Sequence, residues 1–219
     1  MMNGLPLDAL RALVSEIRHD VVVVKNPDIW GSLERGGDWD LVALDPELVA
    51  GRIRRALGTP ESEIRRSYVW SLNYSWGHLD LLPRVEWRGL VLVSAERAFE
   101  GASEAAKDSL MVARPAHQVM AACVYAVLAH GGYKERYEAL WAEAWTTDAD
   151  ELRRLLSKAF GTLDVGPTTT SGDLVSRRSE LQRGLLATGV RHRPWDALRG
   201  LTRFAVAEAR TRGVRQTST

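Results

Sequence analysis

Three aspartates embedded in apolar segments constrain this chain more than any other feature. Asp38 and Asp40 open the apolar run at residues 41–44, and Asp80 is flanked by leucines. A charge beside a hydrophobic core is costly unless it is paired or binds a metal ion. Residues i and i+2 of a strand face the same side, so both carboxylates of the first pair aim at one spot, which a neighbouring strand carrying Asp80 could share. Converging hard oxygen ligands suit Mg²⁺ (or Mn²⁺), so the sequence predicts a metal site at Asp38, Asp40 and Asp80.

Composition limits the classes of protein and partner. With 219 residues, 45% of them hydrophobic, the chain can bury the core of one ordinary domain or two small ones. A net charge of +1 gives no overall attraction to nucleic acid, which is not an expected partner. The single cysteine, Cys123, excludes an intramolecular disulfide and indicates a reducing compartment. No apolar run reaches the ~20 residues of a membrane span, and the first residues lack a signal-peptide pattern, so we expect a cytoplasmic protein without membrane contact.

The pattern of hydrophobic residues changes near residue 100. Before it, helical and strand spacing alternate, with predicted elements at residues 7–17, 21–24, 38–44, 46–57, 68–73, 77–82 and 90–93. After it the spacing is helical, with predicted helices at residues 115–130, 135–145, 148–160, 174–187 and 194–210. Asp148 and Glu151 have the spacing of a capping box. We therefore predict an α+β fold, with a mixed-sheet domain over residues 1–100 and a helical domain over residues 101–219.

The order of these elements resembles a known family. A helix, a strand, a short turn-helix, a strand with the D-x-D pattern and a later acidic strand residue are similar to the DNA polymerase β-like nucleotidyltransferase superfamily. Asp38, Asp40 and Asp80 match its three carboxylates. Residues 133–137 resemble, more weakly, the bacterial nucleotidyltransferase-like proteins found beside sugar and metabolite genes. The resemblance covers roughly the first 95 residues and implies a nucleotidyltransferase-like domain.

The resemblance also implies a reaction and its catalytic residues. An NTP, with ATP expected, would give its nucleoside monophosphate to a hydroxyl group of a small-molecule or protein acceptor, and pyrophosphate would leave. Asp38 and Asp40 would hold the Mg²⁺ that carries the triphosphate and would share a second ion with Asp80. Asp80 would also lower the pKa of the acceptor hydroxyl or take its proton. Residues expected to bind the nucleotide are Lys25, Asn26, Ser32, Lys134 and Arg136.

The phosphate-binding segment departs from the family pattern. The family has a Gly-Ser pair at the end of the first strand, roughly a dozen residues before the first aspartate. Here Gly31-Ser32 is separated from Asp38 by only five residues, whereas Asn26 is separated from it by eleven. Lys25-Asn26 is therefore the positional substitute, with Pro27 able to start a helix whose amides face the phosphates. The alternative is that this segment has lost the ability to bind the phosphates.

Simpler interpretations exist for the same residues. Asp38 and Asp40 could belong to a polar turn, and Asp80 could pair with Arg84 at a strand end. Lys25 could extend from its strand into solvent. His78 shares a face with Asp80 and is expected to orient it. Two other functions remain open: a catalytically inactive nucleotidyltransferase-fold module that binds nucleotide or a partner protein, and a helical scaffold, which leaves Asp80 unexplained.

Overall fold

The computed structural model describes residues 6–25, 38–87, 90–104, 110–132, 135–161 and 165–192. A seven-stranded sheet has the order β3-β4-β5-β2-β1-β9-β8, and β6 and β7 form a separate antiparallel pair. The β2–β5 and β1–β9 pairs are parallel and the other pairs are antiparallel, so the sheet is mixed, as predicted. The strands are β1 (Val21–Val23), β2 (Asp38–Ala43), β3 (Ser62–Arg66), β4 (Val69–Tyr74), β5 (Gly77–Leu82), β6 (Arg84–Trp87), β7 (Leu90–Ser94), β8 (Ser103–Glu104) and β9 (Met111–Val112).

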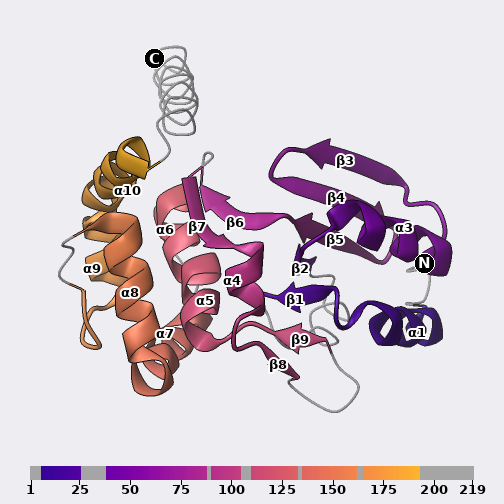
Figure 1. The fold of residues 1–219 in the computed structure, drawn as a ribbon, viewed down its shortest axis with the longest axis horizontal. Coiled ribbons are helices and arrows are strands. Elements are labelled where there is room, and N and C mark those ends of the chain that lie inside the picture. Colours follow the sequence, from indigo (N-terminus) through magenta and orange to yellow (C-terminus); the bar gives the residue numbers. More distant parts are fainter. Residues whose placement is uncertain are drawn as a thin grey trace, which may run out of the picture.

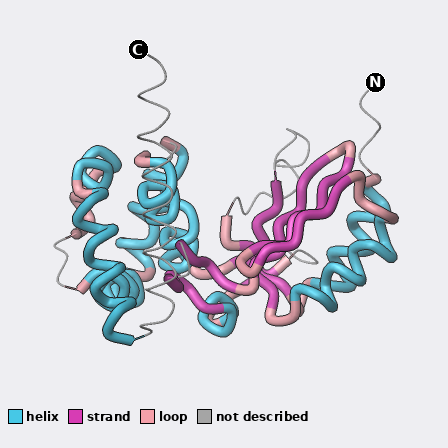
Figure 2. Tube along the Cα trace, turned by 90° about the horizontal axis from the view of Figure 1, so that it is seen from above, coloured by secondary structure: helices cyan, strands magenta, loops and turns pink. Residues whose placement is uncertain are grey.

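The helices lie on both sides of this sheet, with α1 and α3 on one side and α5 to α10 on the other (Figure 1). Seen from above, helices stand at both ends with the strands between them (Figure 2). They are α1 (Leu7–Ile17), α3 (Pro46–Leu57), α4 (Ala95–Phe99), α5 (Pro115–Val119), α6 (Tyr125–His130), α7 (Arg136–Thr147), α8 (Ala149–Phe160), α9 (Ser171–Ser176) and α10 (Arg178–His192). A five-residue π-helical segment, η1 (Met120–Val124), joins α5 to α6. The fold class is therefore α+β. No helix in the described ranges is both long and apolar enough to cross a membrane.

The first hydrophobic core lies between the sheet and helices α1 and α3. Leu10, Leu13 and Ile17 share one face of α1 and are buried against it. Helix α3 begins where the Asp45 carboxylate accepts a hydrogen bond from the Leu48 backbone nitrogen at 3.0 Å. Both helices have the predicted bounds, because apolar periodicity and end signals agree at the sequence level.

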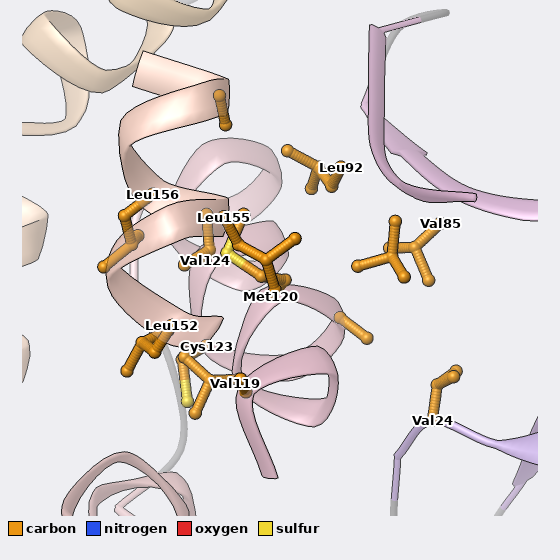
Figure 3. Packing of buried hydrophobic residues seen from close by; sticks show 14 of the residues in the cluster. Val24, Val85, Leu92, Val119, Met120, Cys123, Val124, Leu152, Leu155 and Leu156 are labelled. Carbon is orange, nitrogen blue, oxygen red and sulfur yellow. The ribbon is translucent and has the colours of Figure 1, made fainter. Parts of the chain in front are cut away.

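The second core lies on the opposite face of the sheet. Val24, Val85 and Leu92 face the helix that contains Met120, and α8 packs against that helix from the other side (Figure 3). Cys123 is fully buried in this core. Strand residues from the first hundred positions and helical residues up to Leu185 belong to the same cluster. One continuous core therefore spans residue 100, where the domain boundary was predicted.

Several local features differ from the prediction. Strands β3, β6, β8 and β9 were not predicted, and a turn at Arg177 interrupts the helix predicted at residues 174–187. The capping box between Asp148 and Glu151 is wrong. The Asp148 carboxylate instead binds the Arg114 guanidinium and accepts a hydrogen bond from the Ala116 backbone nitrogen at 3.0 Å, so it caps α5 rather than its own helix. The helix predicted at residues 194–210 lies outside the described residues.

Candidate functional site

The register between β2 and β5 brings the predicted carboxylates to one face of the sheet. The two strands are parallel, with Asp40 directly opposite Asp80 and Asp38 opposite His78. Paired residues of neighbouring strands have their side chains on the same face, and Asp38 is two residues from Asp40. The simpler interpretation, in which Asp38 and Asp40 belong to a polar turn, is wrong because both residues belong to strand β2.

A cleft of about 190 Å³ opens over this face of the sheet. Its floor carries the three aspartates, and the helix of the second core forms the opposite wall through Ala121 and Tyr125. The remaining wall comes from β6 and from the turn between β3 and β4. The lining residues are Lys25, Asp38, Asp40, Tyr68, Val69, Asp80, Leu82, Arg84, Val85, Glu86, Ala121 and Tyr125.

Lys25 is bound to Asp40 inside this cleft. Its ammonium nitrogen lies 3.0 Å from Asp40 Oδ1 and 5.2 Å from the centre of the Tyr125 ring. The Asp40 side chain is only 7% exposed and that of Lys25 is 21% exposed. Burial raises the pKa of Asp40, and the charges of Asp38 and Asp80 add to this while Lys25 opposes it. Burial lowers the pKa of Lys25, but the attraction and hydrogen bond to Asp40, with smaller contributions from Tyr125 and Tyr137, make the net shift upward. Lys25 is therefore a charged partner of the carboxylate and does not extend freely into solvent.

Asp80 is oriented by two neighbours on the same face. Ser71 Oγ donates to Asp80 Oδ1 at 2.5 Å, and His78 Nε2 lies 2.8 Å from the same oxygen. The expected role of His78 in orienting Asp80 agrees with this contact. The alternative pairing of Asp80 with Arg84 is wrong, because Arg84 donates to Glu86 at 2.6 Å.

Both facing aspartates keep one oxygen for a further ligand. Neither Asp40 Oδ2 nor Asp80 Oδ2 makes a hydrogen bond or ion pair with a residue that the structure describes. In a metal-binding carboxylate, a hydrogen bond to the oxygen that does not bind the metal ion orients the group. In the described part of the chain, no three His, Cys, Asp or Glu side chains are gathered closely enough to hold a metal ion as they stand. The donor set thus suits Mg²⁺ in its chemistry, while binding requires side-chain adjustment.

The predicted nucleotide-binding residues are only partly placed. Lys25 lines the cleft, whereas Asn26, Ser32 and Lys134 lie outside the described residues. Arg136 begins α7, and its side chain lies outside the described part as well. Binding of the phosphates by the segment at Asn26 and Pro27 therefore stays a prediction.

Sequence reasoning did not predict the aromatic and β6 walls. Tyr68, Tyr125 and Glu86 all line the cleft. Ala121 and Tyr125 are four residues apart on one helix, and a tyrosine in the otherwise apolar stretch of that helix was the available signal. Burial raises the pKa of Tyr125, while the nearby Lys25 charge opposes the shift.

Comparisons with known proteins add no relative. No protein-family model matches the chain, and no curated protein or solved structure matches it. The geometry of the cleft and the resemblance of the sequence pattern are therefore what bear on function.

Proposed function

We propose that the chain is a magnesium-dependent nucleotidyltransferase that transfers a nucleoside monophosphate from an NTP, with ATP as the expected donor, to a hydroxyl group of a small molecule or protein. The β2–β5 register supports this most strongly, because it sets Asp40 opposite Asp80 on the floor of a cleft. Asp38 lines the same cleft. The similarity of the first strands to the polymerase β-like pattern supports the same reaction.

The three aspartates are the residues that would hold Mg²⁺. Asp38, Asp40 and Asp80 offer hard carboxylate oxygens, two of which have no partner among the described residues. When bound, the ion would neutralise the negative charge that develops on the phosphoryl oxygens and on the leaving oxygen.

Asp80 is the proposed general base. The acceptor oxygen forms a bond to the α-phosphorus, the bond from that phosphorus to the oxygen bridging to the β-phosphate breaks, and pyrophosphate leaves. The acceptor proton passes to the carboxylate of Asp80. Ser71 and His78 hold Oδ1 of Asp80 and so fix the direction of the carboxylate.

The walls of the cleft select the acceptor. A volume of about 190 Å³, bordered by Tyr68 and Tyr125, favours a compact acceptor. The net charge of +1 gives no general attraction to nucleic acid. We propose the cytoplasm as the compartment, where the single cysteine stays reduced.

Thermal stability and product formation test the proposal together. The melting temperature is measured with each of ATP, GTP, CTP and UTP, with and without Mg²⁺, and ATP labelled at the α-phosphate is then incubated with candidate acceptors. We expect a nucleotide-dependent rise that needs Mg²⁺, and a labelled product with equimolar pyrophosphate. Asp80→Asn should remove product formation, whereas Asp150→Asn, at a fully exposed carboxylate on α8, should not. No shift with any nucleotide would leave the scaffold alternative.

One observation favours the inactive-module alternative. The ammonium of Lys25 already occupies an oxygen of Asp40, and the described carboxylates are not gathered around a metal position. Such a module would show the thermal shift with Mg²⁺ and nucleotide but would form no labelled product, even with water or with the protein itself as acceptor. The two readouts therefore separate binding from transfer.

A further inference from the structure

Lys25 is the starting point for an inference about how many cations the cleft holds. It leaves the end of β1 and reaches Asp40, the most buried of the three aspartates. Its ammonium also lies against the Tyr125 ring, 5.2 Å from the centroid. A cation over an aromatic face is attracted by the ring quadrupole, more so when partly desolvated. Lys25 is thus held in position from two sides.

The hydrogen bonds of the two facing aspartates limit how they can bind metal. A carboxylate that bridges two metal ions uses one oxygen for each ion. Asp40 Oδ1 is taken by Lys25, and Asp80 Oδ1 is taken by Ser71 and His78. Only the Oδ2 atom of each aspartate has no partner among the described residues. The facing pair therefore offers one oxygen from each strand, which is enough for one shared ion.

Electrostatic repulsion from Lys25 also limits the cleft to one divalent cation. A second divalent cation at Asp40 Oδ1 would have to approach within a few ångströms of the Lys25 ammonium. Like charges at that distance repel strongly in a partly buried site, where solvent screens them poorly. Lys25 and a second ion therefore exclude each other.

We propose that the cleft holds a single protein-bound divalent cation, held by the Oδ2 atoms of Asp40 and Asp80 together with Asp38, and that the Lys25 ammonium takes the place of a second cation. This inference rests on the proposed function, because it concerns the metal of that site. It assigns Lys25 a positioning role: it neutralises Asp40 and keeps its Oδ1 atom from binding metal. The sequence pattern suggested that Lys25 binds the phosphates of the nucleotide, and this inference gives Lys25 a different role.

Manganese binding to the full chain tests this inference without any activity measurement. Bound Mn²⁺ is counted by titration followed by electron paramagnetic resonance, in the absence of nucleotide. We expect one equivalent in the wild type, with the six-line spectrum of an isolated ion. In Lys25→Met, which keeps an unbranched side chain one atom shorter and removes its charge, we expect a second equivalent and the broadened spectrum of two coupled ions, which lie ~3.5–4 Å apart in two-metal sites.

Matched variants separate charge from shape. Lys25→Arg keeps the positive charge and should keep one equivalent. Tyr125→Phe keeps the ring under the ammonium and should do the same. Lys25→Met leaves a buried carboxylate without its partner, so its melting temperature should fall without metal and rise with Mn²⁺ by more than that of the wild type. This thermal readout keeps the test informative if the variant is only partly folded at the concentrations used for the spectra.

The outcomes distinguish failure of the inference from failure of the proposed function. Two equivalents in both the wild type and Lys25→Met would overturn the inference and leave the metal-dependent reaction standing. One equivalent in both, with the same affinity, would also overturn it, because Lys25 would then not exclude a second ion. If Mn²⁺ binds to none of the variants, with or without ATP, the proposed function fails and the inference fails with it.

Discussion

Asp40 and Asp80 face each other across two parallel strands, and each has one oxygen engaged by a neighbour and one without a partner among the described residues. Strands β2 and β5 are far apart in the sequence, so only the sheet brings the two residues together. The engaged oxygens fix the direction of the carboxylates. The two aspartates line the same cleft, so the other two oxygens are the ones available to a ligand there.

Asp40→Asn should destabilise the protein by about 1–3 kcal/mol. Relief of repulsion from Asp38 and Asp80 acts in the opposite direction, but the substitution removes the negative charge that pairs with the half-buried Lys25 at 3.0 Å. We expect the loss of the pair to dominate. Urea unfolding without metal measures the change, and a neutral or stabilising result would mean that repulsion is the larger effect. The same variant should lose the Mg²⁺-dependent nucleotide shift.

Asp80→Asn should reduce transfer far more than it reduces nucleotide binding. The amide oxygen can still accept from Ser71, so the fold should be retained. The proton acceptor is lost, and loss of a general base typically costs 10²–10⁴-fold in rate. Single-turnover transfer and ATP titration on the same preparation give the two numbers. Equal losses in both would assign Asp80 to nucleotide binding instead.

Asp148→Ala should be one of the most destabilising substitutions in the helical half. Its carboxylate, on a side chain only 5% exposed, binds Arg114 and caps α5 through Ala116. We expect a loss of about 2–4 kcal/mol, since a buried partner and a helix cap are removed together. Asp150→Ala, two residues away on a fully exposed side chain, should change stability by less than about 0.5 kcal/mol. Thermal and urea unfolding of the pair compare a buried and an exposed carboxylate directly.

Stability should fall on acidification in two steps. Burial lowers the pKa of His117 below 6.5 despite its contact with Glu151 at 3.0 Å. The unfolded chain therefore takes up the proton first, and stability declines as the pH falls below 6.5 toward the folded-state pKa. A hydrogen bond from Arg154 lowers the pKa of Glu151 to about 2, so its contribution is lost between pH 4.5 and about 2. Urea unfolding between pH 5 and 8 should show a weaker pH dependence for His117→Gln than for the wild type.

Two glycine-to-alanine substitutions should have opposite effects. At Gly184 in α10 an added Cβ would lie 2.8 Å from the Phe160 carbonyl oxygen, so α8 and α10 must separate, at a cost of about 1–3 kcal/mol. At Gly51 in α3 the nearest atom is the end of the flexible Arg55 side chain at 3.9 Å. Alanine there should stabilise the protein by about 0.5–1 kcal/mol through helix propensity. Melting temperatures of both variants test the closeness of the α8–α10 contact.

The sequence predicts elements well where local signals agree. Helix α1 has a clear apolar stripe, α3 combines such a stripe with clear end signals, and the two-residue spacing of Asp38 and Asp40 gives their shared face. Strand β3 has no such signal, because all five of its residues are exposed at the edge of the sheet. Strands β8 and β9 have two residues each, too short for any period.

Tertiary partners explain what the sequence could not predict at the site. The capping box at Asp148 fails because Arg114, 34 residues earlier, competes for the same carboxylate. The contact between Lys25 and Asp40 depends on the strand register and on the reach of a long side chain, so no spacing rule predicts it. The Tyr125 wall depends on how the helix packs against the sheet.

The π-helical segment η1 has a consequence for how this cleft can change during evolution. A π-helical turn holds one residue more than an α-helical turn, so it can be gained or lost by a single-codon insertion or deletion. Deleting Ala122 would turn every later side chain of the helix by about 100° relative to α5. Tyr125 would leave the cleft, and Lys25 would lose its aromatic support while all three aspartates stayed in place. One codon thus separates two versions of this pocket that share the same acidic floor.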